Sequence, residues 1–493
     1  MSSQEILEQL RQKNKIITPN ALKKLSEPDF KFSTDYLLNS TKFIIDEEDV
    51  KISAQIQKDI DEPKVIVNST TKKYQAAEED SQLIFNKESD ISGKSHCTGT
   101  VEDFVAYFNN RLEKERKILK FQTSTADLLS ISSITSIQSS SKSVRVIGMV
   151  LDKKLSKKGH YIITLEDEQS SLVCLISNSS VQSLKTAAEN LVLDEIICFE
   201  GRFSKDLFIV NEINWPDIPI KEKKLIDSDL NIAFLSDLHV GSKFFMEDVF
   251  NQFLSFLKGE GEFNQYFDIA SKIKYITIAG DLVDGVGIYP SQEKELIIKD
   301  IYKQYEAFCN IVKQFPEHIS VIITPGNHDA VRGGQPQPRI PEEFVGDLKN
   351  YSNVHFLGSP STFTMHGLKT LMYHGDSAFS LIGNVPSLTN AYSNPENIAI
   401  DWLKRRHLSP IYGDNPIIPE KSDYLCINEP PDILHFGHLH RNGYANYRGT
   451  NIINSGAWQS ITDYQLKQGF IPTPAKLPIY NMKNGNFKIL DFQ

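Results

Sequence analysis

The sequence lacks several features that mark common classes of protein. Its opening, MSSQEILEQLRQKNK, is polar and predicts no signal peptide, and no run of 18 or more apolar residues predicts a membrane span. The 5 cysteines are scattered and show no CxxC spacing. This argues against a disulfide framework or a zinc ribbon, and it favours a reducing, cytoplasmic location.

An excess of basic residues is also missing. Asp and Glu number 63 against 53 Lys and Arg, so the formal net charge is −10. We therefore expect no diffuse basic surface of the kind that binds nucleic acid. A local phosphate site stays compatible with this charge, because metal ions can supply the positive charge.

The patterning changes along the chain and predicts five regions. Residues 1–50 show short helical periodicities, which suit either a small helical docking module or a plain extension. Residues 51–100 are rich in charged and hydroxyl side chains and predict a flexible linker, and residues 101–140 predict a helical connector. Five short alternating strands in 141–218 predict a β-barrel of the OB type. Residues 229–493 alternate apolar strands with helical segments, as α/β folds do.

The first hairpin of the predicted barrel is rich in lysine. In OB folds this hairpin often contacts nucleic acid. A solvated hairpin is an equally good interpretation, and a barrel that grips a protein partner is a third. The residues concerned are Lys153, Lys154, Lys157 and Lys158.

Polar clusters follow five apolar strand-like runs in the last region. Strand ends are where α/β folds place their sites, because a rigid sheet directs the following loops to one point. Each cluster alone is a weak signal, since a single His after a strand is usually structural and GNHD suits a turn. Five clusters in order, of which the first four are at nearly equal spacing, indicate a shared site. They are NIAFLSDLHVGS with Asp237 and His239, YITIAGDLVDG with Asp281 and Asp284, VIITPGNHDA with Asn327 and His328, LMYHGDS with His374, and DILHFGHLH with His438 and His440.

This mixture of carboxylate, amide and imidazole groups suits a pair of divalent metal ions. Hydrolysis of a phosphodiester needs hydroxide at neutral pH and neutralisation of the phosphoryl oxygens, and two ions about 3.5–4 Å apart supply both. Imidazole and carboxylate ligands together favour Mn²⁺, Fe or Zn²⁺ over Mg²⁺ and Ca²⁺. The sequence therefore predicts two metal ions, with Mn²⁺ preferred.

The five motifs, in this order, resemble the calcineurin-like metallophosphoesterase superfamily, which implies an α/β/β/α sandwich for 229–493. The resemblance implies that Asp281 bridges the ions, that His328 contacts the phosphate, and that Asp284 hydrogen-bonds His328. Gly285 and Asp329 stand where protein Ser/Thr phosphatases carry Arg and Glu, which disfavours a phosphoprotein substrate. The implied ligands are Asp237, His239, Asp281 and His440 for the first metal, and Asp281, Asn327, His374 and His438 for the second.

A narrower resemblance lies in DLHVGSKFF, IAGDLVDGVGIYP, PGNHDAVR, LKRRHLSPIYG and the tail NSGAWQSITDYQLKQGFIPTPAKLPIYN. These segments are similar to the small subunits of the archaeal D-family DNA polymerase. The resemblance implies a proofreading 3′→5′ exonuclease that acts on single-stranded or frayed 3′ ends beside a large polymerising subunit, in the cytoplasm at the nucleoid. A sliding clamp is a further candidate partner. Two alternatives stay open: a catalytically silent structural B-type subunit and a stand-alone phosphoesterase.

Some further residues have both a functional and a structural interpretation. Asp376, close after His374, either repels a DNA phosphate or acts as an outer-shell partner. His407 is expected to be structural. Candidates for phosphate contacts, with surface salt bridges as the alternative, are Arg332, Arg339, Arg405 and Arg406. Candidates for stacking on unpaired bases, with core packing as the alternative, are Trp458 and Tyr464.

Overall fold

The computed structural model describes residues 3–13, 15–27, 33–39, 42, 44–61, 73–121, 124–135, 142–204 and 207–493. Parts of the predicted linker (62–72) and of the predicted helical connector (122–123 and 136–140) lie outside these residues. The chain divides into two compact units, Met1–Lys72 and Lys73–Gln493. Within the described residues, no helix combines the length and the apolar character that crossing a membrane requires.

The first unit is a small helical module with its own apolar core. Strands β1 (Ile16–Ile17) and β2 (Ile44–Ile45) pair in parallel. The fourth helix continues past residue 50, where the predicted module ends, because EEDVKISAQIQKDID contains no Gly or Pro to stop it. The helices are α1 (Ser3–Gln12), α2 (Pro19–Leu25), α3 (Thr34–Asn39) and α4 (Glu47–Asp61). The core residues are Ile6, Leu10, Ala21, Leu25, Leu37, Ile45 and Val50.

Residues 73–100 differ from the flexible linker that the sequence predicts. Strand β3 (Leu83–Phe85) pairs antiparallel with β14 (Ser361–Met365) and becomes the edge strand of a sheet. The short apolar run LIF between polar stretches is what allows this pairing. Ala76 is fully buried in the core between the two sheets described below, so this segment is fixed along its length.

Strands β5 to β9 close into a barrel in the order β5-β6-β7-β9-β8, with β5 also paired to β8. This confirms the prediction of a five-stranded barrel. Strand β4 (Asp127–Leu129) pairs in parallel with β5, and α6 (Ile131–Thr135) packs in the barrel core, so both belong to the barrel and not to a helical connector. The other elements are β5 (Val144–Leu155), β6 (Tyr161–Glu166), β7 (Ser171–Ile176), α7 (Gln182–Glu189), β8 (Ile196–Ser204) and β9 (Leu207–Asn214).

Helix α5 (Val101–Lys120) joins the barrel to the rest of the second unit. Leu112 packs in a small cluster with barrel residues such as Ile147. On another side of the helix, Nε of Arg111 donates a hydrogen bond to Asp423 at 2.8 Å, and both side chains are buried. The contacts on two sides of α5 fix the barrel against the α/β region.

The α/β region contains two six-stranded sheets packed face to face. One sheet has the order β13-β12-β11-β10-β19-β20, and the other has the order β17-β18-β16-β15-β14-β3. Strands β10 to β13 are mutually parallel, as are β15, β16 and β18. The strands are β10 (Asn231–Leu235), β11 (Ile273–Ala279), β12 (Ser320–Thr324), β13 (Val354–Phe356), β15 (Leu368–Met372), β16 (Ile433–Phe436), β17 (Asn442–Tyr447), β18 (Thr450–Ser455), β19 (Lys476–Asn481) and β20 (Phe487–Asp491).

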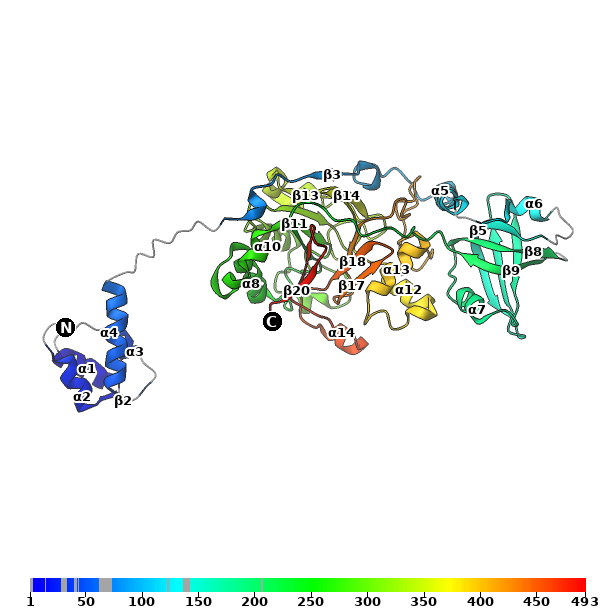
Figure 1. Ribbon diagram of the computed structural model, residues 1–493. Coiled ribbons are helices and arrows are strands. Elements are labelled where there is room, and N and C mark those ends of the chain that lie inside the picture. The colour runs from blue at the N-terminus through cyan, green and yellow to red at the C-terminus, as the bar shows by residue number, and fades with distance from the viewer. Residues whose placement is uncertain are drawn as a thin grey trace. The chain divides into compact units, whose positions relative to one another are not determined.

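Helices cover the outer face of each sheet, which gives four layers (Figure 1). Between the sheets lies an apolar core that includes Phe234 from one sheet and Phe363 from the other. The α-helices are α8 (Glu247–Lys258), α9 (Phe267–Ser271), α10 (Ile301–Val312), α11 (Glu342–Val345), α12 (Ala378–Asn384), α13 (Glu396–Arg405) and α14 (Asp463–Gln468). The 3₁₀ turns are Gln75–Ala77, Lys87–Ser89, Gly261–Tyr266, Gln292–Lys294, Gly346–Asn350 and Pro386–Leu388.

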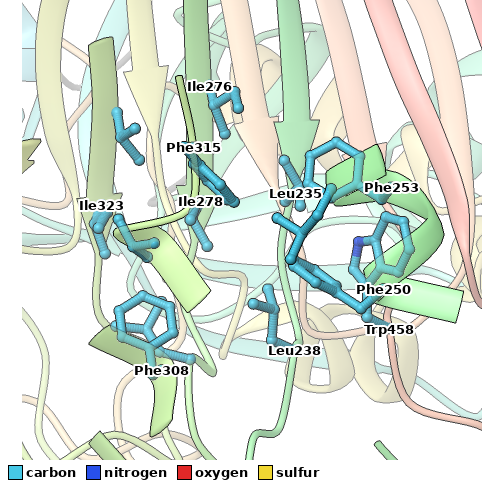
Figure 2. Packing of buried hydrophobic residues seen from close by; sticks show 14 of the residues in the cluster. Leu235, Leu238, Phe250, Phe253, Ile276, Ile278, Phe308, Phe315, Ile323 and Trp458 are labelled. Carbon is cyan, nitrogen blue, oxygen red and sulfur yellow. The ribbon is translucent and has the colours of Figure 1, made fainter. Parts of the chain in front are cut away.

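Aromatic packing anchors helix α8 beside the first sheet. The ring of Trp458 lies 4.8 Å from that of Phe250 and 5.3 Å from that of Phe253, centroid to centroid (Figure 2). Trp458 is 1% exposed. It therefore serves the core, which is one of the interpretations that the sequence left open, and it does not stack on a base.

Candidate metal centre

The predicted site residues follow the carboxyl ends of parallel strands in both sheets. Three clusters follow the adjacent strands β10, β11 and β12 of one sheet, and two follow the adjacent strands β15 and β16 of the other. Because the sheets pack face to face, these five loops meet at one edge of the sandwich. The structure thus brings together Asp237, His239, Asp281, Asp284, Asn327, His328, His374, His438 and His440.

Several of these residues have a backbone conformation that side-chain-bearing residues rarely adopt. The φ angle is 52° at Asp237, 54° at His239, 51° at Asp281, 68° at His438 and 53° at His440. Positive φ is uncommon outside glycine and, where it persists, the surrounding structure must enforce it. The backbone strain is therefore concentrated where the side chains must be aimed at a common point.

One group of ligand atoms surrounds Nε2 of His440. This atom lies 3.1 Å from Nε2 of His239 and 3.3 Å from Oδ1 of Asp237. Nε2 of His239 is in turn 3.7 Å from Oδ2 of Asp281. All four side chains are buried. This set matches the ligands that the sequence implies for the first metal.

A second group surrounds Nε2 of His374. This atom lies 3.2 Å from Oδ2 of Asp281, 3.1 Å from Oδ1 of Asn327 and 3.2 Å from Nδ1 of His438. The same oxygen of Asp281 thus faces both groups, so this carboxylate could be shared by two ions. Asn327 and His438 are partly exposed, so they stand at the mouth of the site.

The tautomer of His374 shows what the second group can hold. Nδ1 of His374 lies 2.8 Å from the carbonyl oxygen of Ala279, which can only accept, so Nδ1 carries the proton. In the neutral ring, Nε2 then presents a lone pair to two oxygens and to Nδ1 of His438. Burial by itself would lower the pKa of His374, but the nearby Asp281 carboxylate raises it well above its ordinary value. The carboxylate of Asp281 beside Nε2 of His374 therefore favours positive charge at this point, which suits a cation.

The carboxylate of Asp284 has a different partner from the one that the resemblance implies. Its Oδ1 lies 3.2 Å from Nδ1 of His239, not from His328. Gln292 and Gln459 each donate a hydrogen bond to this carboxylate, at 2.9 and 3.1 Å. Asp284 therefore stands beside the nitrogen of His239 that faces away from the candidate metal position, where carboxylates that support metal-bound histidines lie.

His328 is held by backbone groups. Its Nδ1 lies 2.8 Å from the carbonyl oxygen of Asp284, so Nδ1 donates and Nε2 is left for a ligand. Its own backbone N–H donates to Oδ1 of Asp281 at 2.9 Å. The implied carboxylate–histidine pair is corrected to a carbonyl–histidine pair, which fixes the tautomer equally well. The side chain of His328 is partly exposed.

Two glycines let the loops approach the carboxylates closely. A Cβ at Gly326 would lie 2.3 Å from Oδ1 of Asp281, and one at Gly437 would lie 2.4 Å from Oδ2 of Asp237. Such distances are far inside van der Waals contact. Asp329 holds the loop of Gly326 in place, because its Oδ2 accepts a hydrogen bond from the backbone N–H of Gly326 at 2.8 Å. Burial, with the charge of Asp281, raises the pKa of Asp329 to about 7.

Two of the predicted phosphate-binding arginines are buried elsewhere. Arg405 pairs with Glu195 of the barrel and, at 2.5 Å, with Asp401. Arg406 donates to the carbonyl oxygens of Ile427 and Asn428 at 2.6 and 2.5 Å. The prediction that Arg405 and Arg406 steer DNA is therefore wrong, because the structure uses them to join segments of the fold.

The two other predicted arginines and Tyr464 lie partly or fully at the surface. Arg332 pairs with Glu420 at 3.0 Å, and the exposed Arg339 lies 3.5 Å from Glu342. Tyr464 is 63% exposed, so stacking by this ring stays a prediction.

The lysines of the predicted nucleic-acid hairpin are divided between two roles. Lys153 donates to the backbone of the barrel at Glu189 and Leu191, and Lys154 pairs with Asp152 at 2.6 Å. Lys157 and Lys158 are exposed and are open to a ligand.

Asp376 and His407 differ in whether their polar side-chain atoms have hydrogen-bond partners. Oδ1 of Asp376 is buried without a hydrogen-bond partner among the described residues. His407 is structural: its Nε2 lies 2.8 Å from Asp423, and its Nδ1 accepts from the backbone N–H of Ser409 at 3.0 Å. Both ring nitrogens are thereby occupied, so the buried group Glu115, His407 and Cys426 lacks a free imidazole nitrogen for a metal.

Sequence reasoning missed the glutamines and aromatic rings that surround the site. The amide of Gln465 lies 2.8 Å from Nδ1 of His440, and Gln459 contacts Asp284. The ring of Phe379 lies 5.5 Å from that of His438. The capping box at Thr462 and Gln465 could have predicted helix α14 from the sequence. No local pattern indicates that this helix contacts His440.

The chain matches known proteins over most of its length. Residues 232–443 match the family of B-type subunits of DNA polymerases alpha and epsilon. The DNA polymerase II small subunit of Methanocaldococcus jannaschii is 43% identical over 424 residues, which cover 85% of this chain and 70% of that protein. Its counterpart in Archaeoglobus fulgidus is 40% identical over 394 residues, covering 79% and 77% of the two chains.

A third such protein, from Methanothermobacter thermautotrophicus, is 37% identical over 406 residues, which cover 82% of both chains. Among solved structures, the S. pombe Stn1–Ten1 complex shares 13% identity over 18% of this chain and 78% of that chain, with a TM-score of 0.17, which supports no conclusion. Identity of this level over most of the length of the three relatives is decisive, and the chain belongs to the family of DNA polymerase II small subunits.

Proposed function

We propose that the chain is the 3′→5′ exonuclease subunit of a two-subunit DNA polymerase and hydrolyses DNA phosphodiester bonds with two divalent metal ions. The observation that carries this proposal is the position of Oδ2 of Asp281. It faces Nε2 of His239 at 3.7 Å and Nε2 of His374 at 3.2 Å, with the remaining predicted ligands around those two atoms. A polymerase subunit with such a centre has an evident use for it in removing misincorporated nucleotides.

The residues present fit two metal ions of the Mn²⁺ type, with Fe and Zn²⁺ as alternatives. Asp237, His239 and His440 would hold one ion, Asn327, His374 and His438 the other, and Asp281 both. Bound ions of this kind supply Lewis acidity toward water and toward phosphoryl oxygens.

The chain's own side chains provide orientation and proton transfer. Because Nδ1 of His328 donates to a backbone carbonyl, Nε2 is the atom that can meet the substrate at the mouth of the site. We assign this atom, when it carries a proton in addition to the one on Nδ1, to donate to a phosphoryl oxygen or to protonate the leaving 3′ oxygen, a role that contributes roughly 10²- to 10⁴-fold to such reactions. Asp284 keeps His239 in the orientation that a metal ligand needs.

Membership of the small-subunit family makes the chain one subunit of a DNA polymerase, partnered by the large catalytic subunit. The same membership disfavours a stand-alone phosphoesterase. The four-layer α/β region then corresponds to a metallophosphoesterase sandwich, and the barrel to an OB-type domain. The exposed Lys157 and Lys158 of its first hairpin are placed to touch DNA or the partner.

The second candidate function is a structural subunit that is catalytically silent. Its support is the match to the B-type subunits of polymerases alpha and epsilon, together with the buried ion pairs that brace barrel and α/β region. The two functions differ in what they require of His328, which has no role in bracing the fold.

The deciding experiment follows a 5′-labelled single-stranded oligonucleotide incubated with Mn²⁺ and the full chain. We expect stepwise shortening from the 3′ end, slowed at least about 100-fold in His328→Ala with unchanged bound manganese. His355→Ala, on strand β13, is the matched control and should cleave normally. Equal, negligible cleavage by the wild type and by His328→Ala at full manganese occupancy would establish the silent subunit instead.

A further inference from the structure

We propose that Phe379, Phe470 and Tyr392 form an aromatic wall that stacks on the base of an unpaired 3′-terminal nucleotide, so that the site selects frayed ends. This deepens the proposed exonuclease function and rests on it. The three rings come from separate segments, yet they form a continuous series that starts at the candidate metal centre.

The series begins at a predicted metal ligand. The ring of Phe379 meets that of His438 edge to face, with centroids 5.5 Å apart and an angle of 69°. Phe470 stacks on Phe379 at 5.4 Å and 27°, and Tyr392 stacks on Phe470 at 4.2 Å and 23°. The three rings are therefore stacked in series, with Phe470 between the other two and the partly exposed Phe379 next to the histidine that faces the second metal position.

The wall is tied to the same segments that place the metal ligands. Phe379 lies in helix α12, which begins shortly after His374. Phe470 follows helix α14, whose Gln465 holds the ring of His440 at 2.8 Å. A shift of either segment would move a ring and a ligand together, so the wall keeps a constant position relative to the metal centre.

Arg441 joins the segments that carry Tyr392 and Phe470. Its Nε donates to the carbonyl oxygen of Ser393 at 3.0 Å, beside Tyr392, and its Nη1 donates to that of Ile471 at 2.8 Å, beside Phe470. One side chain, directly after His440 in the sequence, thus holds both segments. Stacked rings that are braced in this way are preorganised for a flat ligand.

The wall is open to solvent where a ligand must enter. Phe379 is 39% exposed, although it is a large apolar side chain, and the neighbouring Ile471 is 66% exposed. A phenylalanine that served core packing alone would be buried, whereas Phe379 is partly exposed beside a polar site. An aromatic ring next to a phosphate-binding centre is the arrangement that proteins use for single-stranded nucleic acid, where bases of any sequence stack on it.

The occupant we assign is a nucleobase that has left the duplex. A base within a duplex end is already paired and stacked, and freeing it costs least when it is mismatched or already single-stranded. Stacking on aromatic side chains gives roughly a 5- to 150-fold gain in affinity per base. The wall therefore favours binding of a frayed end. Because mismatched ends fray more readily, they should be cleaved in preference to paired ends.

The test uses the full chain and a single-stranded oligonucleotide with 2-aminopurine at its 3′ end, whose fluorescence falls when the base stacks. Binding is measured in Ca²⁺, so that it can be observed without cleavage. We expect the wild type to quench the probe, and Phe379→Leu and Phe470→Leu to bind it roughly 5- to 150-fold more weakly with little quenching. Phe379→Tyr keeps a ring and should behave like the wild type.

Tyr351→Ala is the matched control, because it removes a ring of similar exposure that lies just before β13. Cleavage in Mn²⁺ then gives a second readout, in which the preference for mismatched over paired ends should shrink in Phe379→Leu. Quenching without any cleavage by the wild type would refute the exonuclease function but support the wall. Absent quenching by the wild type, or unchanged quenching and affinity in both Leu variants, would overturn the wall.

Discussion

Oδ1 of Asp284 lies 3.2 Å from Nδ1 of His239, on the opposite edge of the ring from the atom that faces Asp281. This arrangement lets a carboxylate set the orientation and basicity of a metal-binding imidazole. Removing such a partner typically costs roughly 10- to 100-fold in metal affinity or activity. Asp284→Asn should therefore weaken Mn²⁺ binding about 10- to 100-fold at one of two sites, which calorimetric titration measures.

Asp347→Asn is the control for this change. Asp347 pairs with Lys313 on the surface at 2.7 Å and is remote from the strand ends that carry the site. It should leave both manganese affinities at the wild-type value. Undiminished affinity in Asp284→Asn would show that the carboxylate does not support a metal ligand.

Gly326→Ala tests whether the close approach of two loops is needed to present the bridging carboxylate. The added Cβ would lie 2.3 Å from Oδ1 of Asp281, so either the loop or the carboxylate must move. We expect the variant to fold but to retain less than half of the wild-type manganese, as measured by elemental analysis after dialysis.

Gly333→Ala provides the comparison, because a Cβ there meets nothing within 4 Å. Both variants should show the helical circular dichroism of the wild type. Full manganese content in Gly326→Ala would mean that Asp281 is not held in the position described here.

The difference between what the sequence could and could not predict follows from the distance over which residues interact. The ligand set was readable because each motif is local and follows an apolar strand, so that fold topology alone brings Asp237, Asn327 and His374 together. Which side-chain atoms come into contact depends on residues that are distant in the sequence. The resemblance implied a hydrogen bond between Asp284 and His328, but not that a backbone carbonyl would replace the carboxylate.

Burial was equally inaccessible for charged and aromatic residues. Arg405 reads as a surface cation, yet its partner Glu195 is 210 positions away in the sequence. For Trp458 the sequence left stacking and core packing open, and contacts with Phe250 and Phe253 decide for the core. Likewise β3 pairs with a strand far along the chain, which no local composition in a polar segment indicates.

Arg405→Met should destabilise the second unit without changing DNA binding. Removal of the guanidinium leaves the buried carboxylates of Glu195 and Asp401 without their cation, and such losses cost about 3–5 kcal/mol. Guanidinium denaturation should show this loss in the free energy of unfolding. The salt dependence of oligonucleotide binding should stay unchanged, whereas a shallower slope would restore Arg405 to a phosphate-contacting role. Arg339→Met, at an exposed position, should change stability by less than about 0.5 kcal/mol.

His407 should make stability depend on pH in a defined window. Burial, together with the charge of Arg111, lowers its pKa from 6.5 to about 4 in the folded protein. The unfolded chain therefore binds this proton first as the pH falls, so the free energy of unfolding decreases between pH 6.5 and about 4 and is unaffected by this group above 6.5. The full difference corresponds to about 3 kcal/mol.

The measurement compares the wild type with His407→Gln, which keeps an amide donor for Asp423 but cannot titrate. The difference in the free energy of unfolding between the two proteins should be constant above about pH 7 and shift in favour of the variant by about 3 kcal/mol by about pH 4. His355→Gln, at the edge strand β13, serves as the comparison for histidine loss elsewhere in the α/β region. Parallel stability curves for the wild type and His407→Gln across this range would mean that folding does not lower the pKa of His407.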